Sequence, residues 1–303
     1  HIDQMLGGRG DGFKIAMNAL NVGRIKLGVA CLEAQRRVIS NSVKYANERV
    51  QFKKPIAQFG AIKEKLARMA TSCYAGESAN YRAGHDIELK IKSLNDNGMN
   101  FQNSELKGVE EFAIECSIIK VGASEDIQNC ADDGIQIFGG MGFSADTPME
   151  SAWRDARIGR IYEGTNEINR MLSVGMLVKK SMRGQLDLMS SIMSVESEIK
   201  SEIVNENIDV DQPLSEELHK IKNLKKVFLM IAGSAFQKYG LELEKHQQTL
   251  MGLSDMMIEI YFGESALLRT IKNIKRGLDV THQIDMSKLY VFNATETIIR
   301  KSK

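Results

Sequence analysis

The sequence predicts an all-α fold, an antiparallel helical bundle followed by a second helical domain. Apolar residues recur at spacings of three and four along most of the 303 residues, which is the period of one face of a helix. Proline, which breaks helices, occurs only 3 times, whereas methionine, a flexible core filler, occurs 16 times. Alternating runs of β-branched residues do not reach strand length, so we expect no sheet.

The composition is that of an ordinary globular protein, with 43% hydrophobic and 26% charged residues. The formal net charge of +1 gives no electrostatic reason to expect nucleic acid or an anionic membrane as a partner. The 4 cysteines and 5 histidines show no metal-ligand spacing, so we expect no metal and buried, reduced thiols. We also expect no transmembrane segment, because no apolar run reaches the length that crosses a bilayer; peripheral membrane contact stays open.

The first long helix is predicted over residues 12–47, with an interruption at 21–24. One apolar stripe predicts its buried face, and its members are Ile25, Val29, Leu32, Ile39, Val43 and Ala46. The loop 48–60 follows, where Pro55 forces the preceding backbone to be extended.

A second long helix starts after this loop, and the turn residues at 95–98 end it. A third is predicted from about residue 104 on one stripe, formed by Val109, Phe112, Cys116, Ile119, Ala123, Ile127 and Cys130. Shorter helices are predicted over 148–158 and 165–182. Because short loops join these helices, we expect them to pack antiparallel around one core.

Shifts in composition divide the chain into four predicted segments. Residues 1–12, which are rich in glycine, form a loop that leads into a bundle over residues 13–182. Residues 183–214 are rich in Ser, Glu, Asn and Asp and predict a linker, most clearly at 205–211. Residues 215–303 carry three further apolar stripes and predict a C-terminal helical extension without recognisable chemistry.

Glu163 lies on a short turn that the sequence marks as a candidate catalytic site. Gly164 lets the backbone take a positive φ or pass close to a ligand. Thr165 is a suitable N-cap for the next helix, which makes the turn rigid. A carboxylate on such a turn can act as a base, but it can equally be an exposed charge paired with Arg157 or Arg160.

Three motifs around this turn resemble the C-terminal signature of the acyl-CoA dehydrogenase family. In chain order they are QIFGGMGF at 136–143, WRDAR at 153–157 and YEGT at 162–165. The resemblance runs from about residue 6 to 182, and the remainder is similar to the extension of the very-long-chain branch. It implies that this chain lacks the family's N-terminal helical and β domains.

The resemblance implies flavin-dependent α,β-dehydrogenation of acyl-CoA thioesters in fatty-acid β-oxidation, with Glu163 removing the α-proton and FAD accepting the β-hydride. It implies substrate contacts at Asn21, Arg24 and Gly164, although the family often carries an acid where Asn21 stands. It also implies FAD contacts at Arg49, Gln51, Phe52, Phe59, Gln136, Ile137, Phe138, Gly139, Gly140, Thr165, Asn166 and Glu167. Part of this set serves a partner subunit's flavin in the family, so a homodimer is expected.

The resemblance further implies an electron-transfer flavoprotein as electron acceptor. The reduced thiols favour a bacterial-type cytoplasm as location or, second to it, a mitochondrial matrix. One alternative is an acyl-CoA oxidase, in which oxygen reoxidises the flavin. Another is a non-catalytic interaction or assembly module, against which the presence of Glu163 argues. Because this chain would enclose the cofactor from one side only, we expect it to bind FAD weakly and to be inactive by itself.

Overall fold

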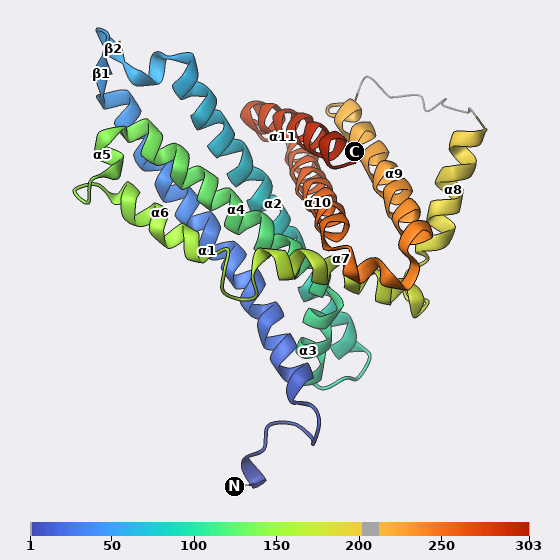
Figure 1. Cartoon of the computed structure of the whole chain (residues 1–303). Helices are drawn as coiled ribbons and strands as arrows, with labels where there is room; N and C mark the ends of the chain where they lie inside the picture. The colour runs from blue at the N-terminus through green and yellow to red at the C-terminus, as the bar shows by residue number, and fades with distance from the viewer. Residues whose placement is uncertain (1, 202–211, 303) are drawn as a thin grey trace.

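Helices dominate the computed structural model, which describes residues 2–201 and 212–302 (Figure 1). Within these residues there are eleven α-helices, three short 3-10 segments and one two-stranded hairpin, so the predicted all-α fold is confirmed. The α-helices are α1 (Gly12–Glu48), α2 (Gly60–Asp96), α3 (Phe101–Glu111), α4 (Ala113–Phe138), α5 (Gly140–Phe143), α6 (Pro148–Ile158), α7 (Asn166–Met182), α8 (Leu188–Lys200), α9 (Ser215–Tyr239), α10 (Gln247–Lys275) and α11 (Thr281–Lys301).

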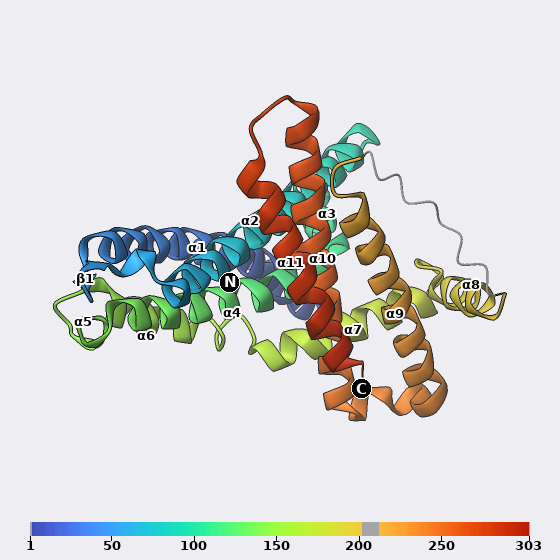
Figure 2. The same cartoon turned by 90° about the horizontal axis from the view of Figure 1, so that it is seen from above.

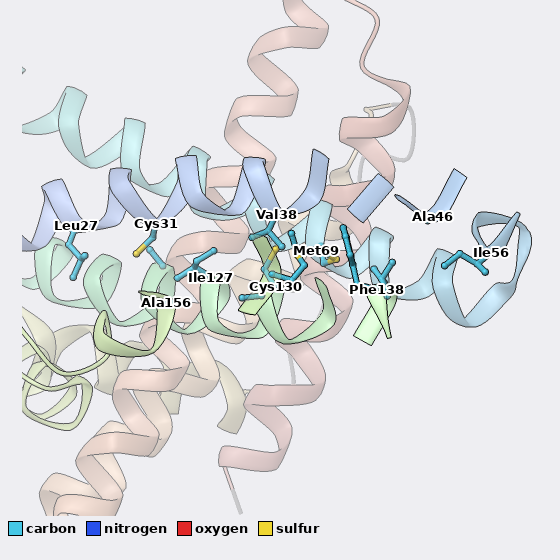
Figure 3. Close-up of a cluster of buried hydrophobic side chains, with 14 residues drawn as sticks. Leu27, Cys31, Val38, Ala46, Ile56, Met69, Ile127, Cys130, Phe138 and Ala156 are labelled. Atoms are coloured by element: carbon cyan, nitrogen blue, oxygen red, sulfur yellow. The ribbon is translucent and has the colours of Figure 1, made fainter. Parts of the chain in front are cut away.

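The first bundle is formed by helices α1, α2, α4 and α6. Their directions alternate along the chain (Figure 1). Its core lies between α1 and α4, with α2 and α6 closing the sides. Figure 3 shows this core, in which Leu27, Cys31 and Val38 of α1 lie over Ile127 and Cys130 of α4.

The first long helix is continuous, whereas the sequence predicted an interruption. Helix α1 runs without interruption through residues 21–24, so the predicted break there is wrong. Helices tolerate a single glycine, and Gly23 is present for another reason, described below. The predicted stripe is partly wrong as well, because Val29 is 54% exposed and Val43 is 40% exposed.

The predicted third helix is two helices. Phe112, with φ −100° and ψ 27°, ends α3 and precedes α4. Neither a proline nor a glycine marks this break, and the apolar period continues across it. The sequence therefore predicted one helix. Helix α3 begins earlier than predicted, at Phe101, because the side chain of Asn100 caps it by accepting from the N–H of Asn103.

A small hairpin corrects the expectation of no sheet. Strands β1 (Val50–Gln51) and β2 (Lys54–Pro55) pair antiparallel, and Phe52 and Lys53 make the turn between them. Both turn residues have positive φ, 50° and 66°, as a two-residue turn of this hand requires. Such turns usually carry Asn-Gly, and therefore Phe-Lys gave no sequence signal for one.

The C-terminal helices α9, α10 and α11 enclose a second core that includes Ile221, Leu253, Leu267 and Ile298. Val174 of α7 is 1% exposed and belongs to this second core, although α7 also packs against α4. Figure 2 shows α7 passing from the first bundle to the C-terminal helices. Helix α8 lies inside the predicted linker 183–214. The part at 205–211, where the sequence predicts the linker most clearly, lies outside the described residues.

All four cysteines are buried and free, as predicted: Cys31, Cys73, Cys116 and Cys130. Burial raises the pKa of Cys31 and of Cys116 to about 12, and that of Cys73 to about 11. These thiols are therefore inert parts of the core and not candidate nucleophiles.

By length and composition alone, α1 could cross a membrane, which differs from the expectation that no segment could. This measure is weak, because the core helix of a globular protein passes it too. Helix α1 packs against α2, α4 and α6, and it buries Asn18, Asn21, Arg24 and Gln35 against them. The same helix contributes Leu27, Cys31 and Val38 to the core of the bundle.

Candidate active site

The turn between α6 and α7 presents Glu163 on an unusual backbone. Glu163 has φ 59° and Gly164 has φ 82°, so both lie in the left-handed region. The N–H of Asn166 donates to the carbonyl of Arg160 at 3.1 Å and closes the turn. A residue other than glycine in this region is strained unless its surroundings hold it, and such strain gathers at functional sites.

Two buried side chains hold the backbone of this turn. Arg24 of α1 donates from Nε to the carbonyl of Glu163 at 3.2 Å, and Asn169 of α7 donates from Nδ2 to the same oxygen at 3.3 Å. Asn169 also donates to the carbonyl of Gly164 at 2.7 Å. Arg24 is 2% exposed and donates to Oδ1 of Asn21 at 3.1 Å, and its burial lowers its pKa. The predicted residues Arg24 and Gly164 therefore lie at Glu163, and Asn21 is joined to this turn through Arg24.

Gly23 makes room for the Glu163 side chain. A Cβ atom at Gly23 would lie 2.6 Å from the carboxyl carbon of Glu163. Glycine at this point of α1 thus lets the carboxylate lie directly against the helix. The sequence predicts only a bend at Gly23, because spacing along the chain does not show that Glu163 lies close to it.

The first turn of α7 confirms the predicted N-cap. Thr165 accepts from the N–H of Ile168 at 3.3 Å. The carboxylate of Glu167 accepts from its own backbone N–H and from the Thr165 hydroxyl, which lowers the pKa of Glu167. The helix that follows the turn is therefore fixed at its start.

The side chain of Asn166 points into the bundle. It is 1% exposed, and its Oδ1 accepts from Nζ of Lys120 at 2.6 Å. Its Nδ2 donates to the hydroxyl of Ser124 at 3.1 Å and to Oε1 of Glu125 at 3.0 Å. Lys120 is completely buried, and burial lowers its pKa to about 8. Sequence reasoning missed Lys120, although a lysine between Ile119 and Val121 on an apolar face was a usable signal.

The alternative view of Glu163 as an exposed, paired charge gains no support from the arginines around it. Arg160 lies 3.6 Å from Glu125, on a different helix. Within the described residues, no ion pair joins Glu163 to Arg157 or Arg160. Glu163 is half-buried, and its carboxylate is oriented by packing against Gly23.

The other predicted FAD contacts gather at the far end of the bundle, where the hairpin lies beside α5 in both views (Figures 1 and 2). The side chains of Arg49, Gln51, Phe52 and Gln136 are exposed there. Phe59 is partly buried, with Phe52 against its edge at 6.1 Å. Along α4, Gln136 lies about 18 Å from Ser124, given a rise of 1.5 Å per residue, and Ser124 contacts Asn166. One chain therefore carries two separate groups of predicted cofactor residues.

The glycines at this end fit a cofactor that approaches the backbone closely. Gly139 has φ 62°, and a Cβ at Gly139 or Gly140 would meet nothing within 4 Å. Ile137 and Phe138 are different, because they are 3% and 9% exposed and belong to the core. Phe138 stacks on Tyr45 at 4.1 Å, so these two residues can offer a ligand only their backbone.

Known sequences and structures match the chain over both helical parts. The pattern of the acyl-CoA dehydrogenase C-terminal domain matches residues 10–175, and a second pattern with the same description matches residues 223–303. A probable acyl-CoA dehydrogenase of Bacillus subtilis is 40% identical over 272 residues, which cover 90% of this chain and 46% of that protein. The human mitochondrial very long-chain specific acyl-CoA dehydrogenase is 38% identical over 169 residues, which cover 56% of this chain and 23% of that protein.

Among solved structures, an acyl-CoA dehydrogenase from Bacillus anthracis complexed with FAD has a TM-score of 0.92 to this chain and 39% identity. The match covers 96% of this chain and 49% of that one, so the chain spans about half the length of its Bacillus relatives. The motifs, the fold and the matched ranges agree: the chain belongs to the acyl-CoA dehydrogenase family.

Proposed function

We propose that this chain supplies the catalytic base and part of the FAD site of a flavin-dependent acyl-CoA dehydrogenase. The observation that carries the proposal is the presentation of Glu163. Its backbone is in the left-handed region, its carbonyl is held by two buried side chains, and its carboxylate rests on a glycine. This arrangement fixes a carboxylate in one place, which is what proton abstraction requires.

Glu163 removes the α-proton of an acyl-CoA thioester. An acyl chain laid over the turn strips water from the carboxylate, and a less solvated carboxylate is a stronger base. The N–H of Glu163 is the donor for the thioester carbonyl, where negative charge develops as the α-proton leaves. Among the described hydrogen bonds, this N–H donates to no backbone carbonyl, so it is available to a ligand.

FAD, when bound, supplies the acceptor for the β-hydride. Arg49 has a planar fork of donors that suits a pyrophosphate, and Gly139 and Gly140 leave the backbone open to close approach. Thr165 and Glu167 lie beside Glu163 and serve the flavin end, together with the backbone of Asn166. Because the two groups are separated along α4, we assign the Arg49 and Gln136 group to the FAD of a second copy in a homodimer.

The test is Glu163→Gln in a completed enzyme, a chimera that joins this chain to the preceding half of the Bacillus anthracis protein. The amide keeps the shape of the side chain but cannot take a proton, so turnover should fall by about 10²–10⁴-fold with flavin still bound. Glu150→Gln on α6, which removes an exposed pair with Arg154, is the matched control and should leave turnover unchanged. Turnover of the Glu163→Gln variant at the parent rate, on acyl-CoA of every chain length tried, would refute the proposal.

The same completed enzyme distinguishes the electron acceptors. We assign reoxidation to an electron-transfer flavoprotein, in which case flavin reduced by acyl-CoA would stay reduced in air until this acceptor is added. Rapid reoxidation by oxygen would instead assign the chain to the acyl-CoA oxidases. Bound flavin with no turnover on any acyl-CoA would favour a non-catalytic module.

A further inference from the structure

Helix α7 packs against both α4 and α10, and its first two turns carry a network of partly buried charges. We propose that Arg170 is a positioning residue through which helices α10 and α11 fix the turn that carries Glu163. The inference rests on the proposed function only in that it takes Glu163 to be the base. It gives the C-terminal extension a role in this active site.

Glu125 of α4 is the centre of the network on the side of the first bundle. Both of its carboxylate oxygens accept from Arg170, at 2.8 Å from Nη1 and 2.7 Å from Nη2, in a two-pronged pair. The same carboxylate accepts from Asn166 at 3.0 Å and lies 3.6 Å from Arg160. Asn166 and Arg160 bracket the turn, so Glu125 holds both of its ends.

Asp255 of α10 is the centre on the side of the C-terminal helices. It accepts from Nε of Arg170 at 2.6 Å and from Nζ of Lys301 of α11 at 2.5 Å. Arg170 is 9% exposed, so its guanidinium spans the boundary between the two cores with all three nitrogens engaged. A planar guanidinium fixed on both sides has a single orientation.

Other contacts on α7 make the same connection. The hydroxyls of Ser173 and Ser254, both fully buried, lie 2.9 Å apart. One residue further on, Val174 packs into the core of α9–α11. One side of α7 is therefore attached to α10 by charge, hydrogen bonding and apolar packing together.

The connection reaches Glu163 through the residue next to Arg170. Asn169 donates to the carbonyls of three successive residues of the turn, at 3.3, 2.7 and 3.1 Å from Glu163, Gly164 and Thr165. A helix moves as a rigid unit, so a shift of α7 relative to α4 displaces Asn169 and the carbonyls that it holds. The left-handed conformation of Glu163 then loses one of its two fixed supports.

The experiment uses the completed enzyme with Asp255→Ala, which removes the acceptor on α10 and leaves the Arg170–Glu125 pair. Amide hydrogen exchange over residues 160–170 should rise by about tenfold, the size expected when one member of a buried network is lost. Turnover should fall by about tenfold with KM within about twofold, because the base is misplaced and the acyl-CoA site remains. Asp255→Asn keeps an acceptor for Nε and should recover part of both effects.

Glu264→Gln is the matched control, because Glu264 of α10 pairs with Arg82 of α2 at 3.0 Å and with Lys225 of α9, and no described hydrogen bond or ion pair joins it to α7. It should leave exchange at 160–170 and turnover unchanged. Equal effects of Asp255→Ala and Glu264→Gln on that segment would overturn the proposal, as would a rise in KM with turnover intact. An inactive parent enzyme would refute the proposed function, whereas the exchange measurement would still test the connection.

Discussion

Gly23 decides where the carboxylate of Glu163 can lie. Most helical glycines lower stability relative to alanine, so a glycine in the middle of α1 carries a cost of about 1 kcal/mol that function must offset. The Cβ of alanine at this position would overlap the carboxyl group, whose atoms lie 2.6–2.7 Å away. The carboxyl group is the far end of a flexible side chain, so it would move aside at little cost to the fold.

Gly23→Ala should therefore separate stability from activity. We expect the free energy of unfolding to stay the same or to rise by up to about 1 kcal/mol, while turnover of the completed enzyme falls by about tenfold or more. Gly84→Ala in α2 is the control, because a Cβ there meets nothing within 4 Å. It should give the same gain in stability by thermal unfolding with full activity. A Gly23→Ala enzyme with full activity would show that the contact with Gly23 does not matter.

At the level of single residues, the sequence could identify groups with local signals. Glu163, Gly164 and Thr165 follow one another, so their turn and cap could be predicted from spacing. Lys120 and Asn169 could not be connected to that turn, because their contacts join helices far apart in the sequence. Contacts of this kind depend on how helices pack, and a periodic pattern does not specify packing partners.

At the level of elements, the helices with long stripes were predictable and the short connections were not. The ends of α2, α6 and α7 lie close to the residues where turn and cap signals stand. The break at Phe112 and the hairpin at Phe52 and Lys53 use residues with no turn preference, so tertiary contacts must impose them. The face of α1 was also misjudged, because Val29 and Val43 extend an apolar period onto an exposed side.

The packing of α10 on α4 should make stability depend on pH. Burial raises the pKa of Glu259 to about 7 from 4.5, and Asp255 and Glu125 act in the same direction, whereas Tyr290 and Arg300 oppose it. Asp126 of α4 faces the same site, and burial followed by the charge of Glu259 raises its pKa as well. Between pH 4.5 and about 7, the folded chain thus keeps a proton on Glu259 that the unfolded chain has lost.

Stability at this site is therefore greatest below pH 4.5 and is lost as the pH rises towards 7. We expect a contribution that falls by up to about 1.4 kcal/mol per pH unit in that window. Glu259→Gln should flatten this part of the dependence in urea unfolding of the chain at several pH values. Glu244→Gln, an exposed carboxylate after α9, should leave the slope as it is. An unchanged slope in Glu259→Gln would show that Glu259 is ionised in the folded chain.

At the level of the whole molecule, we propose that the described residues offer a cofactor two partial surfaces, each of which encloses it from one side. The Arg49 group and the Glu163 turn are separated along α4, and the chain covers 49% of the Bacillus anthracis protein that binds FAD. A ligand held on one side loses much of its buried area while it still bears the entropic cost of immobilisation. The extended apolar stripes nevertheless give the helices cores of their own.

Purified residues 1–303 should therefore fold without retaining flavin. We expect a helical circular dichroism spectrum, a colourless protein, and no turnover when FAD, acyl-CoA and an electron acceptor are added. The completed enzyme prepared in the same way is the control and should be yellow. Stoichiometric flavin on the chain alone would mean that its two surfaces are sufficient.

The four buried thiols can report on the local separation of the helices around them. Only a thiolate is alkylated readily, and the raised pKa values of Cys31, Cys73 and Cys116 keep these groups protonated at neutral pH. Alkylation of these thiols therefore requires that the surrounding helices separate. Because Cys31 and Cys130 lie in the α1–α4 core, and Cys73 lies on α2, the order in which they are modified records which helices part first.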